Sequence, residues 1–136
     1  LKFAGTISSD DAEQMRRAIE EGCERIDPMD GRYLLDTNVV IALLNNEPNP
    51  VREFQAAEAV YLPSVALGEL YYGAQQAQRP VDNRLRIEQF AHNIVVVPVD
   101  EFASRHYGEL KAALAASGRL IPDNDLWIAA VQSSMD

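Results

Sequence analysis

This sequence predicts a single α/β domain built on a parallel sheet, and three observations support that fold. From about residue 32 onward, short apolar segments alternate with segments of helical periodicity, the pattern of strands joined by crossover helices. The strand-like segments are continuously apolar, as in strands covered on both faces. The length of 136 residues is common for one domain.

Apolar runs and the residues between them define the elements in order. A strand over 33–35 ends at Asp36, and Pro63 stops a second strand over 60–62. The run 94–97 is the most β-branched in the chain, so it predicts a central strand covered on both faces. Helices are expected over residues 39–44, 52–59, 64–78, 82–92, 100–117 and 126–131.

Two of these helices begin at residues suited to capping. Ser64 is expected to cap the helix over 64–78, and Asp100 starts the helix that ends before Gly118. The apolar stripe of the helix that starts at Asp100 predicts its buried face, with His106 as a core histidine. That stripe consists of Phe102, His106, Leu110 and Ala113/Leu114.

The chain changes character near residues 27–31, which predicts a helical tail over 1–28 and a domain over 29–136. Ser8, Ser9 and Asp10 can cap the tail helix. Because such a helix has a single apolar face, it needs a partner surface to be stable. That face consists of Ala12, Met15, Ile19, Cys23 and Ile26.

Composition excludes several classes of protein. The formal net charge of −9 argues against binding of nucleic acid through a basic surface, although a nuclease built on carboxylates can be acidic. No apolar stretch is longer than residues 94–99, far short of a membrane span. Because Cys23 is the only cysteine, no internal disulfide forms, and a reducing cytoplasm is the expected compartment.

Three acidic residues suit a functional site, and each has a plainer alternative. Asp36 ends the first strand, where open parallel sheets place ligands, but it can equally cap the next helix. Glu69 lies in a helix with little exposed surface, so it should be paired with an arginine, protonated or bound to a metal. Asp125 lies in the first turn of the last helix, where any anion is favoured.

Taken together, the three acids indicate a cation site. Two carboxylates about 4 Å apart repel by roughly 4 kcal/mol at an effective dielectric constant near 20, so a convergent triad requires a positive ion. Mg²⁺ and Mn²⁺ prefer such oxygen ligands. Zinc is disfavoured because His92, His106 and Cys23 lack the spacing of zinc ligands.

Three segments in order resemble the signature motifs of the PIN domain, and the match is nearest to VapC-type toxins. They are YLLDTN (33–38), PSVALGELYYG (63–73) and NDLWIAA (124–130). The resemblance implies a metal-dependent endoribonuclease that dimerises and cleaves RNA using Mg²⁺ or Mn²⁺. The matching metal ligands and catalytic residues are Asp36, Glu69 and Asp125, and the matching site-shaping residues are Asn38 and Ser64.

The end of the chain departs from the family pattern. A further strand with another acidic or polar residue usually follows the last helix, whereas this sequence stops at Asp136. We therefore expect a domain truncated at its C-terminus, with one sheet edge open and a weakened second metal position.

The tail resembles the inhibitory end of a partner antitoxin. The segment FAGTI (3–7) and residues 11–27 carry this likeness, and Met29 looks like the start of a toxin. If the tail inhibits, in its own chain or in another, Arg16, Arg17 or Arg25 can enter the acidic pocket in place of the metal. An ordinary helix that completes the core is the alternative. The tail contains no DNA-binding unit, so DNA binding is not expected.

The predicted function is therefore cleavage of RNA by metal-bound hydroxide, with the tail as an inhibitor. The competing hypothesis is a catalytically silent PIN-like module that forms a toxin–antitoxin-like assembly. In that module, Asp36 and Glu69 merely balance tail arginines.

Overall fold

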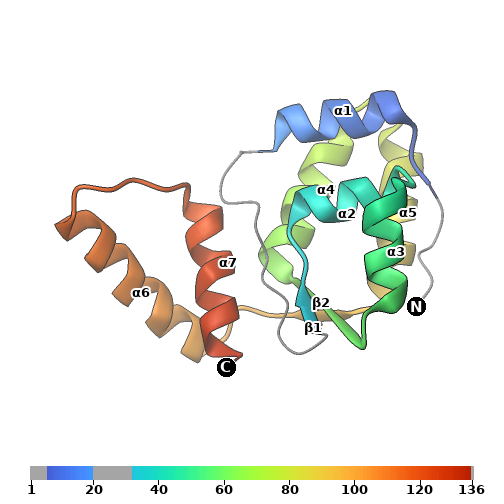
Figure 1. The fold of residues 1–136 in the computed structure, drawn as a ribbon. Coiled ribbons are helices and arrows are strands. Elements are labelled where there is room, and N and C mark those ends of the chain that lie inside the picture. Colours follow the sequence, from blue (N-terminus) through green and yellow to red (C-terminus); the bar gives the residue numbers. More distant parts are fainter. Residues whose placement is uncertain (1–5, 20–31, 136) are drawn as a thin grey trace.

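The computed structural model describes residues 6–19 and 32–135, and these contain a three-stranded parallel sheet with surrounding helices (Figure 1). The strands are β1 (Arg32–Leu34), β2 (Ala59–Pro63) and β3 (Val95–Val97), in the order β1-β2-β3. The predicted parallel α/β fold is confirmed. The helices are α1 (Ser9–Ala18), α2 (Thr37–Leu44), α3 (Pro48–Ala56), α4 (Ser64–Gln75), α5 (Pro80–His92), α6 (Glu101–Ala116) and α7 (Asp123–Ser134).

Strand pairing brings two helix starts to one edge of the sheet. Tyr33 lies beside Val60, and Leu62 lies beside Val96. Because parallel strands run in the same direction, β1 and β2 end on the same side, and α2 and α4 begin there. This carboxyl edge is where parallel α/β sheets place their ligands.

The prediction that β3 is a central strand covered on both faces is wrong. It lies at an edge of the sheet beside β2, and Val95 is 56% exposed. A β-branched sequence favours a strand but does not determine its place in the sheet, which depends on the helices that pack beside it. Here the central strand is β2, and its Leu62 is fully buried.

Helix α1 completes the core of the domain. Ser8 caps it by accepting a hydrogen bond from the Asp11 backbone nitrogen at 3.1 Å, as predicted. Ala12 and Met15 are fully buried against α2 and α4, which confirms that part of the predicted stripe. Cys23 and Ile26 lie outside the described residues.

Close packing of α1 on α4 depends on a glycine. A Cβ added to Gly73 would lie 3.1 Å from Cδ1 of Ile19 and 3.4 Å from Cβ of Met15. Since the first distance is tighter than ordinary packing, the absence of a side chain lets the two helices approach. The tail helix is therefore an integral part of the packed domain, as its single apolar face requires.

Helices α6 and α7 form a hairpin at one side of the molecule (Figure 1). The rings of Tyr107 and Trp127 stack between them with centroids 3.7 Å apart. The predicted stripe of α6 is not its buried face: Phe102 is 53% exposed, His106 is half-buried, and Ala103 is fully buried. The reason is that α7 is the main neighbour of α6 among the described elements, so the face toward Trp127 is covered.

At the beginning of α3, α4 and α7, a proline makes the helix start or the N-cap differ from the prediction. Helix α3 begins at Pro48, earlier than residue 52, because proline suits the first helical position. The N-cap of α4 is Pro63 rather than Ser64, and α7 begins after Pro122 rather than at residue 126. Asp100 caps α6 as predicted. None of the helices in the described ranges is long and apolar enough to cross a membrane.

Candidate active site

Asp36 lies at the carboxyl edge of the sheet, directly after β1 and Leu35. Its Oδ1 accepts a hydrogen bond from the Val39 backbone nitrogen at 2.9 Å, so it caps α2. The residue is only 6% exposed. The helix N-terminus stabilises its negative charge in this buried position. The capping interpretation is thus confirmed, and it leaves the carboxylate where a ligand of this fold class would bind.

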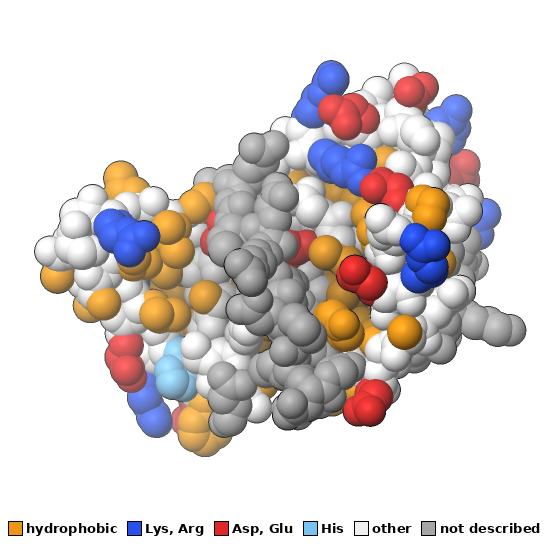
Figure 2. All heavy atoms as spheres, in the orientation of Figure 1, with side chains coloured by type: hydrophobic (Ala, Val, Ile, Leu, Met, Phe, Trp, Pro, Cys, Tyr) orange, Lys and Arg blue, Asp and Glu red, His pale blue; other side chains and the backbone are white. Residues whose placement is uncertain are grey.

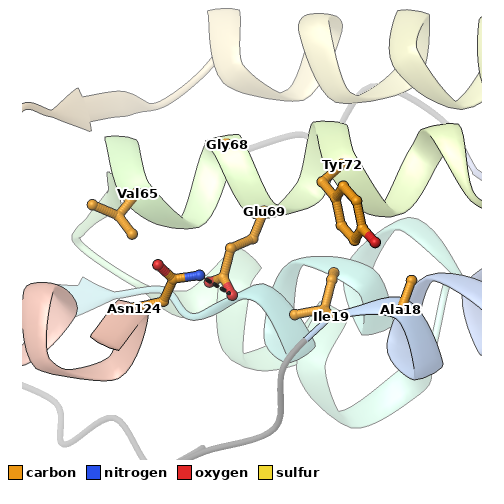
Figure 3. Close-up of a pocket in the computed structure, with 7 residues that line it drawn as sticks. All are labelled: Ala18, Ile19, Val65, Gly68, Glu69, Tyr72 and Asn124. Carbon is orange, nitrogen blue, oxygen red and sulfur yellow. Dashed lines mark hydrogen bonds between the residues drawn. The ribbon is translucent and has the colours of Figure 1, made fainter. Parts of the chain in front are cut away.

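Glu69 projects from α4 into a pocket of about 460 Å³ (Figure 3). Its Oε2 accepts a hydrogen bond from Nδ2 of Asn124 at 3.0 Å, and this contact joins α4 to the start of α7. Glu69 is half-buried. The described residues that line the pocket are Ala18, Ile19, Val65, Gly68, Glu69, Tyr72 and Asn124.

Asp125 occupies the first turn of α7, next to Asn124, and is half-buried. The two polar residues predicted to shape the site lie at the start of other helices: Asn38 in the first turn of α2 and Ser64 as the first residue of α4. Each of these helices begins just after a strand, so the end of that strand determines where the polar side chain lies.

Sequence reasoning missed Asn124 as a site residue. It was recognised only as the residue before Asp125 in the third motif, yet it binds Glu69 directly. An amide in the first turn of a helix, beside a predicted ligand, was the available signal. The amide donates a hydrogen bond to Glu69 and so orients its carboxylate.

The donor chemistry suits a hard divalent cation, because three carboxylates supply oxygen ligands. Within residues 6–19 and 32–135, no group of three or more acidic, histidine or cysteine side chains has the arrangement of a formed metal site. Mutual repulsion of about 4 kcal/mol for a pair at 4 Å opposes such a grouping unless a cation is bound. The structure joins Glu69 to Asn124, and the assignment of Asp36, Glu69 and Asp125 to one metal site stays a prediction.

Helix α1 contributes to the same pocket through its last residues. Ala18 and Ile19 line the pocket opposite Glu69 and Asn124 (Figure 3). The end of the tail helix therefore forms part of the wall of this pocket, as expected for an inhibitory segment and equally for a helix that completes the core.

The arginines of α1 bind other acids. Arg16 donates to Glu47 at 2.5 Å, and Arg17 donates to Glu13 at 3.2 Å. Of the three arginines predicted as candidates to enter the acidic pocket, these two instead bind carboxylates outside it. Arg25 lies outside the described residues.

The Arg16–Glu47 pair joins α1 to the turn before α3 and lowers the pKa of a carboxyl group there. The hydrogen bond from Arg16 holds the pKa of Glu47 below its usual value, with a second bond from Asn45 acting in the same direction and burial opposing both. A carboxyl group with a lowered pKa stabilises the folded chain above its unfolded pKa, and this contribution is lost as pH falls through the folded pKa.

We therefore expect Glu47→Gln to lower the free energy of unfolding at pH 7 and to have progressively less effect as pH falls below about 4.5. Urea unfolding of both proteins between pH 7 and pH 3 measures this. Glu53→Gln, on the exposed surface of α3, is the control. A difference between Glu47→Gln and wild type that stays constant over the whole range would contradict the assignment.

The fold and the acidic residues at the sheet edge define a PIN-like α/β domain. Residues 33–133 match the PIN domain model, and the chain belongs to this family. It is 36% identical to ribonuclease VapC2 of Haemophilus influenzae over 101 residues, 73% of this chain and 76% of the relative. It is 39% identical to the tRNA(fMet)-specific endonuclease VapC of Shigella flexneri over 100 residues, 72% and 76% of the two chains.

Solved structures agree with this placement. The DNA-bound VapBC of Salmonella typhimurium matches with a TM-score of 0.68 at 32% identity, covering 75% of this chain and 79% of that chain. Within the PIN domain family, this chain is a VapC-type protein.

Proposed function

We propose that this chain is a toxin endoribonuclease of the VapC type, which hydrolyses phosphodiester bonds of RNA. The observation that carries the proposal is the match of residues 33–133 to the PIN domain, because this range contains all three acidic motifs. The similarity to two VapC relatives named as a ribonuclease and as an endonuclease supports the same reaction.

Asp36, Glu69 and Asp125 would hold a divalent cation, Mg²⁺ or Mn²⁺, with Asn38 and Ser64 shaping the surroundings. Such an ion activates water and stabilises charge on the phosphate. Of the chain's own residues, Asn124 orients the carboxylate of Glu69, and the hydrogen bond from the Val39 backbone nitrogen holds Asp36 at the start of α2.

The substrate class is a structured RNA, with tRNA as the first to test. The relative from Shigella flexneri is named for its action on a tRNA. The formal net charge of −9 argues against binding of RNA through a broad basic surface, so contact with the phosphate would depend on the bound cation.

The partners would be an antitoxin-like segment and a second copy of the chain. Ala18 at the end of α1 and Ile19 directly after it line the pocket that contains Glu69, which supports inhibition by the chain's own N-terminal segment. Hydrophobic side chains gather on the α6–α7 side of the molecule (Figure 2), and the exposed ones there include Phe102, Leu120 and Ile121. An exposed apolar patch of this kind supports association of two chains.

Cleavage of tRNA in Mg²⁺ and in EDTA tests the proposal. We expect slow endonucleolytic cleavage by the wild-type chain in Mg²⁺, because α1 covers the pocket, and none in EDTA. Glu69→Gln should remove the cleavage, while Glu58→Gln, an exposed carboxylate between α3 and β2, should not. Equal cleavage by Glu69→Gln and wild type, or cleavage that persists in EDTA, would refute the assignment.

A further inference from the structure

Helix α1 carries a buried carboxylate that the proposed reaction does not use. Asp11 is fully buried, and its Oδ2 accepts a hydrogen bond from Nδ2 of Asn83 at 2.8 Å. Its Oδ1 lies 3.4 Å from Nη1 of Arg79, which is also 3.3 Å from Oγ of Ser8. Asn83 belongs to the start of α5 and is itself only 2% exposed.

The other contacts of α1 with the same face of the domain discriminate poorly between helices. Ala12, Met15 and Ile19 form an apolar stripe, and many amphipathic helices present such a stripe. Arg16 and Glu47 are partly exposed, so a salt bridge between them contributes modestly. Neither contact would strongly reject a wrong helix of similar size.

The contact of Asp11 differs because an unsuitable side chain at this buried position would be destabilising. A buried carboxylate is tolerated only when it is paired, and a buried amide is destabilising when its acceptor is missing. Asn83 donates to a carboxylate from inside the domain, so a helix with an apolar side chain at this position would leave that amide unpaired. Rejection of imperfect partners by such buried polar groups is a general source of specificity.

We propose that Asn83 and Arg79 form a recognition site for one carboxylate, that of Asp11, and that this contact selects the helix that covers the candidate active site. The occupant is α1 of the same chain, whose Ser8 cap and Asp11 carboxylate both meet Arg79. This inference rests on the proposed function only in naming the site that the helix covers. The recognition itself is a property of the two helices α1 and α5.

Swapping the carboxylate of Asp11 and the amide of Asn83 tests whether these two side chains recognise each other. In Asp11→Asn the buried hydrogen bond loses its charged acceptor, and in Asn83→Asp two carboxylates face each other. In the double variant Asp11→Asn/Asn83→Asp, the amide and the carboxylate change places and the bond can form again. Both changes also alter charges near helix N-termini, and a double-mutant cycle removes these separate effects.

The measurement is hydrogen–deuterium exchange of the α1 backbone amides in the full chain. We expect Asp11→Asn and Asn83→Asp each to raise the exchange rate roughly tenfold or more, because the first replaces a charged hydrogen bond by a neutral one and the second brings two carboxylates face to face. The double variant should recover most of the protection. Glu13→Gln removes an exposed carboxylate and its surface salt bridge to Arg17 from the same helix and should change the exchange far less.

Two results would overturn the proposal: unchanged exchange in Asp11→Asn, or a double variant that exchanges as fast as the faster single variant. Because the readout requires no RNA, it remains valid even if the chain cleaves none. A failure of recognition is therefore distinguishable from a failure of the proposed function.

Discussion

Asp36→Asn is expected to lower RNA cleavage by at least about 100-fold, the scale on which loss of one electrostatic stabiliser acts at an active site. The substitution removes a negative charge at the carboxyl edge of the sheet but keeps an oxygen that can accept the hydrogen bond from Val39. Since asparagine and aspartate cap helices about equally well, the stability of the fold should change little. Cleavage of tRNA in Mg²⁺ and thermal unfolding of the same preparation measure the two effects.

The chain offers a matched control for this substitution. Asp100 caps α6 as Asp36 caps α2, with its Oδ1 2.9 Å from the Ala103 backbone nitrogen, but it is exposed and lies outside the candidate site. Asp100→Asn should leave cleavage unchanged. If Asp36→Asn and Asp100→Asn have the same effect on cleavage, Asp36 acts only as a helix cap.

Met15→Asp is expected to release α1 from the domain and to raise the cleavage rate at least about tenfold. Met15 is fully buried against α4, and an unpaired carboxylate in its place would be destabilising enough to displace the helix. Displacement would remove Ala18 and Ile19 from the pocket that contains Glu69. The rate of tRNA cleavage and the binding of Mn²⁺ by calorimetry should both increase.

Two further variants distinguish release of α1 from general unfolding of the domain. Met15→Ala leaves a cavity instead of a charge and should shift cleavage in the same direction by a smaller amount. Glu13→Asp places the same residue on the exposed face of α1 and should change nothing. A folded Met15→Asp protein that cleaves no faster than wild type would show that α1 completes the core without inhibiting.

The parts of the fold that sequence predicts well depend on neighbouring residues. Ser8 and Asp100 cap the helices that they precede, and Ala12 and Met15 are buried as their spacing requires. These features follow from backbone hydrogen bonding and from the periodicity of one helix, both of which are local. The parallel sheet is predictable for a related reason, because alternation of strands and helices limits the topologies that a chain can adopt.

The features that sequence did not predict depend on tertiary packing. The run of valines in β3 is suited to a central strand, yet β2 takes that place. Likewise, Phe102 lies on the most apolar stripe of α6 but is exposed, because α7 covers another face. Composition determines that a segment can be buried, whereas the surrounding elements determine whether it is.

The candidate site likewise combines features that follow from neighbouring residues with features that depend on tertiary packing. The positions of Asp36 and Glu69 follow from the starts of α2 and α4. The bond from Asn124 to Glu69 joins residues far apart in sequence, and no local rule predicts it. Sequence also did not predict that Arg16, one of three arginines able to enter the acidic pocket, would bind Glu47, because that pair joins α1 to the turn before α3.

The central claim is that α1 covers a ribonuclease site that depends on Asp36, and one comparison tests it most directly. The rate of tRNA cleavage in Mg²⁺ is measured for Met15→Asp and for the double variant Met15→Asp/Asp36→Asn. We predict faster cleavage than wild type for the first and loss of that cleavage in the second. Equal rates for the two variants would contradict the claim.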